Sequence, residues 1–277
     1  VLLVTPNARE AARLGDRVVI RCTRAGRVRR VLDVPLARPR AANDRDAWRA
    51  VIAPLAAAGC TVLVPDLPGH GLSEGPPLAS IEALADWLAE LLETAGCARA
   101  VIAGHSMGSL VALECAARHP QRISGLALLG SSAPMPVAES LLNSAVDQAD
   151  SVYRLITDYS LTPRFQLRGG GGHGVWGAGA VLAIMRRSPR GALAIDLANC
   201  HNYQRGLAAA AQVDCPVLLL VGRRDRMTPR RNLPPLRAAL RHAVQREIAD
   251  CGHAMMVEQP LIVADELKQF MTTLDDG

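Results

Sequence analysis

Short apolar runs alternate with longer helical patterns along most of this 277-residue chain, and that alternation restricts the fold more than any other feature of the sequence. The runs at 61–66, 99–104, 125–130 and 216–222 are each bounded by turn residues, which is typical of buried strands. Because helical segments separate these strands, they form βαβ units with parallel strands. The sequence therefore predicts an α/β fold with a mostly parallel sheet flanked by helices.

Weaker patterns add further elements along the chain. Three more strands are expected, at 17–22, 29–34 and 244–250. Three helices are expected, at 45–59, 80–96 and 108–120. The helix at 80–96 has the clearest amphipathic pattern, and Ser80 is placed to cap its first turn.

The alternation stops between residues 131 and 212, in a segment that lies between two strands of the sheet. This segment is helical in places and contains a glycine run at 169–174, which is typical of a flexible joint. We therefore predict a core formed by residues 1–130 and 213–277, with residues 131–212 inserted as a helical cap over the sheet. No individual cap residue is predicted to bind a substrate.

In one place an apolar run leads directly into a helical pattern, at Gly104-His105-Ser106-Met107-Gly108. A strand that turns into a helix within one or two residues needs small neighbours, and Gly104 and Gly108 supply that room. The residue at the apex is held outward at the carboxyl end of the strand, where parallel sheets bind ligands and the helix directs its N-terminal amides. This is the G-x-S-x-G nucleophile elbow in its strand-to-helix context, and it makes Ser106 the candidate nucleophile.

A serine hydroxyl needs a general base, and the base needs a carboxylate that orients it. Asp225 follows the strand at 216–222, and His253 lies in the loop after the last strand. The order Ser106, Asp225, His253 is the order in which partners of this elbow occur along a chain. We therefore predict that Ser106 is the nucleophile, His253 the base and Asp225 the orienting acid.

Other histidines and aspartates compete for these roles. The rival histidines are His70 in a turn, His105 in the elbow, His119 at a helix end, His242 at the surface, and His173 and His201 in the insertion. The side chain of His105 is expected to point away from the catalytic face, so substrate binding is not assigned to it. The rival acids are Asp66, expected to cap backbone amides of a turn, and Asp250, expected to close the last strand.

Charge and cysteine content argue against several classes of protein. The formal net charge is +5, but Lys268 is the only lysine and the arginines are scattered without interleaved aromatic residues, so nucleic acid is not an expected partner. The seven cysteines include no CxxC pair, so neither a disulfide framework nor a metal site is predicted. No apolar run approaches the roughly 18 residues of a membrane span. We expect a cytoplasmic protein that uses no metal or organic cofactor and acts on a small molecule.

Five segments in order along the chain carry a family resemblance. They are DAWRAVIAPLAAAG, VLVPDLPGHGLSEGP, GHSMGSLVALECAARHP, PVLLLVGRRDRMTP and CGHAMMVEQP. Together they resemble the α/β-hydrolase superfamily, and most closely the small bacterial serine hydrolases with a helical cap. The resemblance covers nearly the whole chain, and it implies the α/β-hydrolase fold, with the cap inserted into the core.

The resemblance also implies an oxyanion hole made of two backbone amides, of which Met107 supplies one. In family members a His-Gly pair marks the loop that supplies the other, whereas this chain has VLDVPLARPRAAND there. Pro35 and Pro39 have no N–H, so the second donor is expected at Leu36, Ala37 or Arg38, or else is missing.

The residues and the resemblance together predict a serine hydrolase that cleaves a carboxylic ester through an acyl-enzyme intermediate. Hydrolysis of a lactone or enol-lactone, cleavage of a C–C bond in a diketone, and perhydrolase activity use the same triad and stay open as alternatives. Serine at the elbow argues against epoxide hydrolases and haloalkane dehalogenases, which resemble this scaffold but have aspartate there. The alternative from another class is a non-catalytic binding member of the fold, suggested by the missing His-Gly pair.

Overall fold

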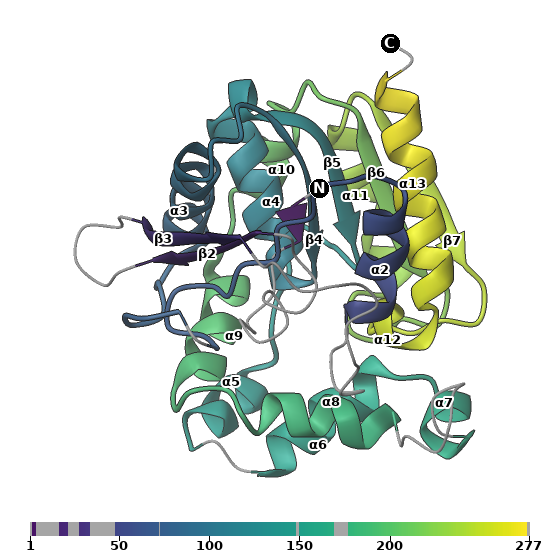
Figure 1. Ribbon diagram of the computed structural model, residues 1–277. Coiled ribbons are helices and arrows are strands. Elements are labelled where there is room, and N and C mark those ends of the chain that lie inside the picture. Colours follow the sequence, from purple (N-terminus) through teal and green to yellow (C-terminus); the bar gives the residue numbers. More distant parts are fainter. Residues whose placement is uncertain are drawn as a thin grey trace.

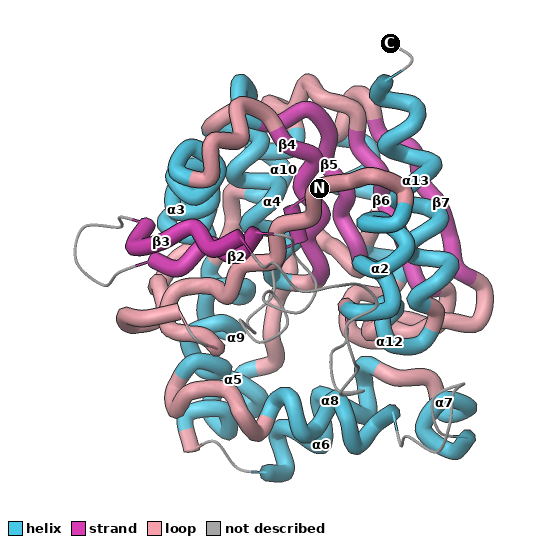
Figure 2. The backbone as a smooth tube through the Cα atoms, in the orientation of Figure 1, coloured by secondary structure: helices cyan, strands magenta, loops and turns pink. Residues whose placement is uncertain are grey.

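Five parallel strands form the central sheet of the computed structural model, in the order β1-β4-β5-β6-β7 (Figures 1 and 2). A separate two-stranded sheet pairs β2 antiparallel with β3. The strands are β1 (Leu2–Leu3), β2 (Arg17–Arg21), β3 (Val28–Asp33), β4 (Ala100–His105), β5 (Ile123–Leu129), β6 (Val217–Gly222) and β7 (Ala243–Ile248). The structure describes residues 2–3, 17–21, 28–33, 48–71, 73–147, 150–168 and 177–275. The predicted α/β fold with a parallel sheet is confirmed.

Helices occupy most of the segments between the strands. They are α2 (Arg49–Ala57), α3 (Ile81–Thr94), α4 (Met107–Arg118), α5 (Glu139–Val146), α6 (Asp150–Ser160), α7 (Pro163–Arg168), α8 (Gly177–Met185), α9 (Ala192–Asn202), α10 (Gly206–Ala210), α11 (Pro234–Ala239), α12 (Met255–Glu258) and α13 (Pro260–Asp275). Helix α3 begins as its sequence predicts, because the Ser80 hydroxyl accepts a hydrogen bond of 3.1 Å from the N–H of Ala83.

Side chains along β4, β5 and β6 alternate between two apolar clusters, one on each face of the sheet. In β5, Leu126 and Leu128 belong to the first cluster, and Ala127 and Leu129 belong to the second. Helices α3, α4, α10 and α11 contribute to the first cluster, and α2, α12 and α13 contribute to the second (Figure 1). Both faces of the sheet are therefore covered, as a parallel sheet requires.

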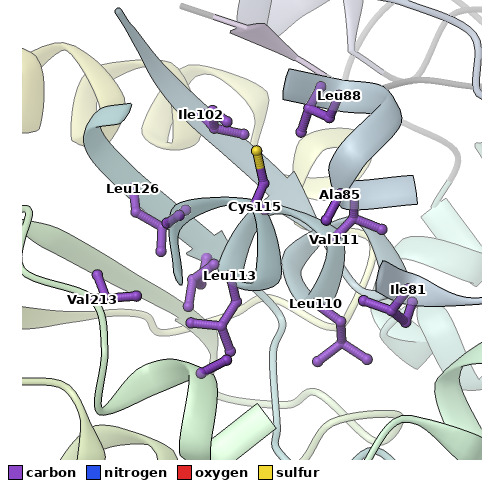
Figure 3. Close-up of a cluster of buried hydrophobic side chains, with 14 of the residues drawn as sticks. Ile81, Ala85, Leu88, Ile102, Leu110, Val111, Leu113, Cys115, Leu126 and Val213 are labelled. Carbon is purple, nitrogen blue, oxygen red and sulfur yellow. The ribbon is translucent and has the colours of Figure 1, made fainter. Parts of the chain in front are cut away.

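Helix α4 is the most deeply buried helix of the first face. Figure 3 shows its side chains against those of α3 and of strands β4 and β5. The residues labelled there are Ile81, Ala85, Leu88, Ile102, Leu110, Val111, Leu113, Cys115, Leu126 and Val213. Because α4 packs on both neighbours, its N-terminus is fixed relative to the end of β4, and the elbow lies at that junction.

Helices α5 to α8 lie together on one side of the core (Figures 1 and 2). The last residue of α6 is hydrogen-bonded to the loop that follows β7, since the N–H of Ala254 donates to the carbonyl oxygen of Ser160 at 2.9 Å. Helix α10, near the end of the segment predicted as an insertion, packs against α4, and Ala209 and Ala210 belong to the first apolar cluster. The glycine run at 169–174 lies outside the described residues.

One predicted strand is wrong. Residues 61–66 were expected to form a buried strand, and Val62, Leu63 and Val64 are indeed buried, but only Leu63 forms a β-bridge. Burial selects apolar residues whether or not the backbone pairs with a strand, so an apolar run by itself does not establish a strand.

Three further observations concern the described residues taken together. The six cysteines that the structure describes are free thiols. No helix in the described part of the chain combines the length and the apolar character needed to cross a membrane. The same residues hold no group of three or more His, Cys, Asp or Glu side chains that could bind a metal ion.

Candidate active site

The elbow has the backbone that its motif predicts. Ser106 has φ 54° and ψ −122°, and it is the only non-glycine residue with positive φ in the described part of the chain. Its N–H donates to the carbonyl oxygen of Leu129 at 3.0 Å, and its own carbonyl oxygen accepts a 2.6 Å hydrogen bond from the Ser109 hydroxyl. A left-handed conformation at a residue with a side chain is strained, so the surrounding contacts must hold it in place.

The two glycines of the motif have different surroundings. A Cβ atom on Gly104 would lie 2.1 Å from the carbonyl oxygen of Gly108 and 2.8 Å from the Cα atom of Ser109. A Cβ atom on Gly108 would meet no described atom within 4 Å. The close approach of strand and helix therefore requires glycine at 104 only, which corrects the expectation that both glycines supply room.

Asp225 and His253 are brought together by the loops that follow β6 and β7. Nδ1 of His253 lies 2.8 Å from Oδ2 of Asp225, and the two residues are 4% and 5% exposed. The Thr228 hydroxyl donates to the same Oδ2 at 2.7 Å, while Oδ1 accepts from the N–H groups of Met227 and Thr228, each at 2.8 Å. The carboxylate is thus saturated with donors and its orientation is fixed.

Glycines let the two loops meet. Gly222 ends β6, and a Cβ atom there would lie 2.2 Å from the carbonyl oxygen of Gly252, the residue before His253. Gly130 follows β5 with φ 55°, and a Cβ atom there would lie 3.0 Å from Nδ1 of His253 and 3.4 Å from Oδ2 of Asp225. The Asp225–His253 pair therefore packs directly against backbone, and a side chain at either glycine would displace it.

The pKa of Asp225 is lowered despite its burial. Burial raises the pKa because it penalises the charged form. The charge of His253 and the hydrogen bonds from His253 and Thr228 outweigh that penalty and lower the pKa from 3.8 to about 2. Asp225 is therefore an anion at neutral pH, and it holds a proton on Nδ1 of His253, which leaves Nε2 as the proton acceptor.

His105 lies against the base rather than apart from it. Its Nε2 donates to the carbonyl oxygen of His253 at 2.8 Å, and the centroids of the two rings are 4.5 Å apart. The ring of Trp48 contacts His105 edge-on from a centroid distance of 6.3 Å. Burial, and then the charge of His253, lower the pKa of His105 to about 3, so this ring is neutral at pH 7.

The rival histidines and acids have other partners. His70 contacts the carbonyl oxygen of Pro68 and the carboxylate of Asp196, His119 contacts Asp86, His201 contacts the backbone of Val137, and His242 is exposed. The carboxylate of Asp250 forms an ion pair of 2.9 Å with Arg224. Asp66 is 3% exposed, and its carbonyl oxygen accepts a hydrogen bond from the hydroxyl of Ser73. His173 lies outside the described residues.

Of the two expected oxyanion donors, only Met107 lies among the described residues. Met107 is the first residue of α4, where a helix leaves its N–H groups without an intrahelical acceptor. Leu36 and the rest of residues 34–40 lie outside the described part of the chain, so the second donor stays a prediction.

Comparison with known proteins assigns the chain to a family. A family model for the alpha/beta hydrolase fold matches residues 41–260. The chain is an α/β hydrolase. The resemblance inferred from the five sequence segments is thereby confirmed.

The hydrolase has bacterial esterases among its relatives. It is 31% identical over 240 residues to a pimeloyl-[acyl-carrier protein] methyl ester esterase of Aromatoleum aromaticum, covering 77% of this chain and 88% of that protein. It is 29% identical over 221 residues to the esterase of the same description from Chromobacterium violaceum, covering 72% of this chain and 79% of that protein. These relatives support the prediction that the hydrolase acts on ester bonds.

Among solved structures, a thermophilic esterase from Thermogutta terrifontis superposes on the hydrolase with a TM-score of 0.72. The two chains are 24% identical over 83% of this chain and 86% of that one. At this level of identity the likeness shows the fold, and it confirms the α/β-hydrolase architecture predicted from the sequence.

Several residues of the hydrolase's site were missed by sequence reasoning. Gly130 and Thr228 contact the acid–base pair, and His105 contacts its base. A signal was present for the turn that contains Thr228, since an aspartate is typical of a turn in which its carboxylate accepts the backbone N–H two residues on. Gly130 had no comparable signal, because a glycine at the end of a strand is also the ordinary start of a turn.

Proposed function

We propose that this hydrolase cleaves a carboxylic ester by a Ser106–His253–Asp225 triad. The observation that carries the proposal is the buried hydrogen bond between Asp225 and His253. Both residues follow strands of the sheet whose strand β4 leads into the strained Ser106. Ser106 follows β4, Asp225 follows β6 and His253 follows β7, so the three side chains come from the carboxyl edge of one parallel sheet. Ligands of open α/β sheets bind at that edge.

In the proposed reaction the Ser106 hydroxyl oxygen attacks the ester carbonyl, while Nε2 of His253 takes its proton. The resulting imidazolium is stabilised by the Asp225 carboxylate and then protonates the departing alcohol, which leaves an acyl group on Ser106. A water molecule attacks that acyl group, His253 accepts the proton of the water and returns it to the Ser106 oxygen, and the carboxylic acid is released. No metal or organic cofactor takes part.

The negative oxygen of each tetrahedral intermediate needs hydrogen-bond donors. We assign one to the N–H of Met107, at the N-terminus of α4, where the helix dipole also favours negative charge. The second donor is expected near Leu36, where the His-Gly pair of other family members is missing. Loss of one donor costs about 100- to 1000-fold in rate, so a weak second donor would give a slow enzyme rather than an inactive one.

The proposed substrate is a small-molecule ester, and the names of the two curated relatives favour a methyl ester. We propose that helices α5 to α8, within the predicted insertion 131–212, form the cap that covers the acyl chain. A cytoplasmic location fits the six described free thiols, because disulfides are rare in reducing compartments.

The experiment that tests this function measures hydrolysis of short and long p-nitrophenyl esters, and of methyl esters of short and medium fatty acids. Wild type should turn over at least one of these series, and Ser106→Ala should lose almost all of that rate. A fluorophosphonate probe should label wild type at Ser106 and leave the variant unlabelled.

The other results separate the alternatives. Wild type that hydrolyses no ester and resists the probe would contradict the proposal and favour the non-catalytic binding member of the fold. Labelling of Ser106 without turnover of any ester would move the assignment to lactones, C–C bonds or perhydrolysis, which use the same triad.

A further inference from the structure

The end of α6 is attached to both loops that carry the acid and the base. The guanidinium of Arg226, next to Asp225, donates to the carbonyl oxygen of Asp158 and lies 4.6 Å from the ring centroid of Tyr159. On the other loop, the N–H of Ala254, next to His253, donates to the carbonyl oxygen of Ser160 at 2.9 Å. Residues 158–162, which we call the tether segment, therefore contact the immediate neighbour of each proposed triad residue on these two loops.

Glu258 completes this attachment from the end of α12. Its Oε1 accepts hydrogen bonds from the N–H of Gly252 at 3.1 Å and from the N–H of Thr162 at 3.0 Å. Its Oε2 accepts a 2.5 Å hydrogen bond from the Thr162 hydroxyl. One carboxylate thus joins the loop that carries His253 to the tether segment.

The space around Gly252 shows how closely these parts approach. A Cβ atom on Gly252 would lie 2.6 Å from Oε1 of Glu258 and 2.8 Å from the carbonyl oxygen of Ser160. Ser160 is 6% exposed and Thr162 is 5% exposed, so water cannot easily replace these hydrogen bonds. Burial raises the pKa of Glu258, and the carboxylate keeps its place because three donors face it.

The contacts fix the backbone on both sides of the base. Gly252 is held by Glu258, and Ala254 is held by Ser160, so the dihedral angles around His253 are restrained from each side. The carbonyl oxygen of His253 itself accepts from His105 and from the N–H of Met255, each at 2.8 Å. Among these restraints, the one from Ser160 comes directly from the tether segment, and the one from Glu258 is connected to that segment through Thr162.

We infer that Glu258 is a positioning residue, which aligns His253 by clamping its loop to the tether segment of the cap. The inference rests on the proposed triad. It predicts that the base is correctly aligned only while the cap segment 158–162 is seated on the loop. Loss of Glu258 should therefore lower kcat, whereas KM should change little because Glu258 is not proposed to touch the substrate.

Glu258→Ala and Glu258→Gln form a matched pair. Alanine removes every acceptor, whereas glutamine keeps the carbonyl oxygen that both N–H groups need, because both bond to Oε1. The glutamine amide can also donate to the Thr162 hydroxyl, which reverses the third hydrogen bond without removing it. Rescue by glutamine would show that hydrogen bonding positions the loop and that the negative charge is not needed.

Tyr203→Phe is the control for a loss of stability that does not reach the base. The Tyr203 hydroxyl donates to the buried Glu114 carboxylate of α4 at 2.6 Å, and no described contact joins this pair to His253. Thr162→Val serves as a second variant of the clamp in case Glu258→Ala does not fold, since it removes only the hydroxyl contact and keeps the N–H to Oε1.

The measurements are kcat and KM on the best ester, the rate of fluorophosphonate labelling, and Tm. We expect Glu258→Ala to lose about 10- to 100-fold in kcat and labelling rate, as misplacement of a reacting group does. Thr162→Val should lose less, and Glu258→Gln should stay within about threefold of wild type. Tyr203→Phe should lower Tm while kcat stays within about threefold.

Three results would overturn the inference. They are unchanged kcat in Glu258→Ala, a loss in Glu258→Gln as large as in Glu258→Ala, or a loss of kcat in Tyr203→Phe equal to that of Glu258→Ala at a similar Tm. These differ from a failure of the proposed function, in which wild type itself would neither hydrolyse an ester nor react with the probe.

Discussion

Replacing Gly104 with alanine should disrupt the elbow, although none of the proposed catalytic residues is changed. The added methyl group would lie 2.1 Å from the carbonyl oxygen of Gly108, 2.5 Å from its carbonyl carbon and 2.8 Å from the Cα atom of Ser109. All three are backbone atoms, so no side chain can rotate away to make room. The strand and the first turn of α4 must separate instead.

The size of the effect follows from these distances. Ordinary van der Waals contact begins at 3.4 Å, so the shortest contact requires a movement of about 1.3 Å. Ser106 lies between the two elements and must move with them. A displacement of about 1 Å in a reacting group costs about 100-fold in rate, and overpacking of this kind costs about 1–3 kcal/mol of stability. We therefore expect kcat to fall by about 100-fold or more, with a lower Tm.

Gly108→Ala is the matched control in the same motif. No described atom lies within 4 Å of the position its Cβ would take, and alanine is favoured over glycine inside a helix by up to about 1 kcal/mol. The control should keep kcat within about threefold and its Tm should not fall. Hydrolysis of a p-nitrophenyl ester, fluorophosphonate labelling and thermal unfolding measure these effects. Wild-type kcat in Gly104→Ala, or an equal loss in both variants, would refute the steric reasoning.

Four further predictions concern the site and α3. Gly130→Ala should lower kcat by about 10-fold or more, because its Cβ would lie 3.0 Å from Nδ1 of His253 and its φ of 55° strains any side chain; unchanged kinetics would contradict this. Asp225→Asn should lower kcat by about 10⁴-fold. Because the pKa of Asp225 is lowered from 3.8 to about 2, its contribution to stability is complete above pH 3.8 and lost as the pH falls through about 2. The free energy of unfolding of wild type should therefore fall by about 2 kcal/mol more than that of Asp225→Asn over this window, as urea titrations at each pH would show. Ser80→Ala should remove the cap of α3 and cost about 1 kcal/mol, measured as a change in the urea midpoint.

The sequence predicted those parts of the fold in which local preference and burial agree. Helix α3 has an apolar face, a capping serine and a turn after it, so its pattern, its start and its end all indicate the same element. The run at 61–66 had burial alone, and only Leu63 forms a bridge. A strand is defined by its partner, which a single run cannot specify.

The candidate site also contains residues that the sequence could predict and residues that it could not. Ser106, Asp225 and His253 follow strands, and a parallel sheet gathers its carboxyl ends at one edge, so topology places these loops near one another. His105 lacks such an argument. Its place in the elbow predicts a side chain that points away from the catalytic face, and only the three-dimensional contact with the His253 backbone shows that it lies against the proposed base.

The glycines of this site show why motif spacing and steric need are separate properties. Gly104, Gly222 and Gly130 each stand where a Cβ would press on backbone or on the acid–base pair, but only Gly104 belongs to the recognised motif. Gly108 belongs to the motif and meets no such restriction among the described residues. Close backbone approaches at the ends of β4, β5 and β6 therefore help to position the side chains of the site. The alignment of the Ser106 and His253 side chains must then depend on residues that touch no substrate. The proposed clamp by Glu258, which aligns His253, is one example.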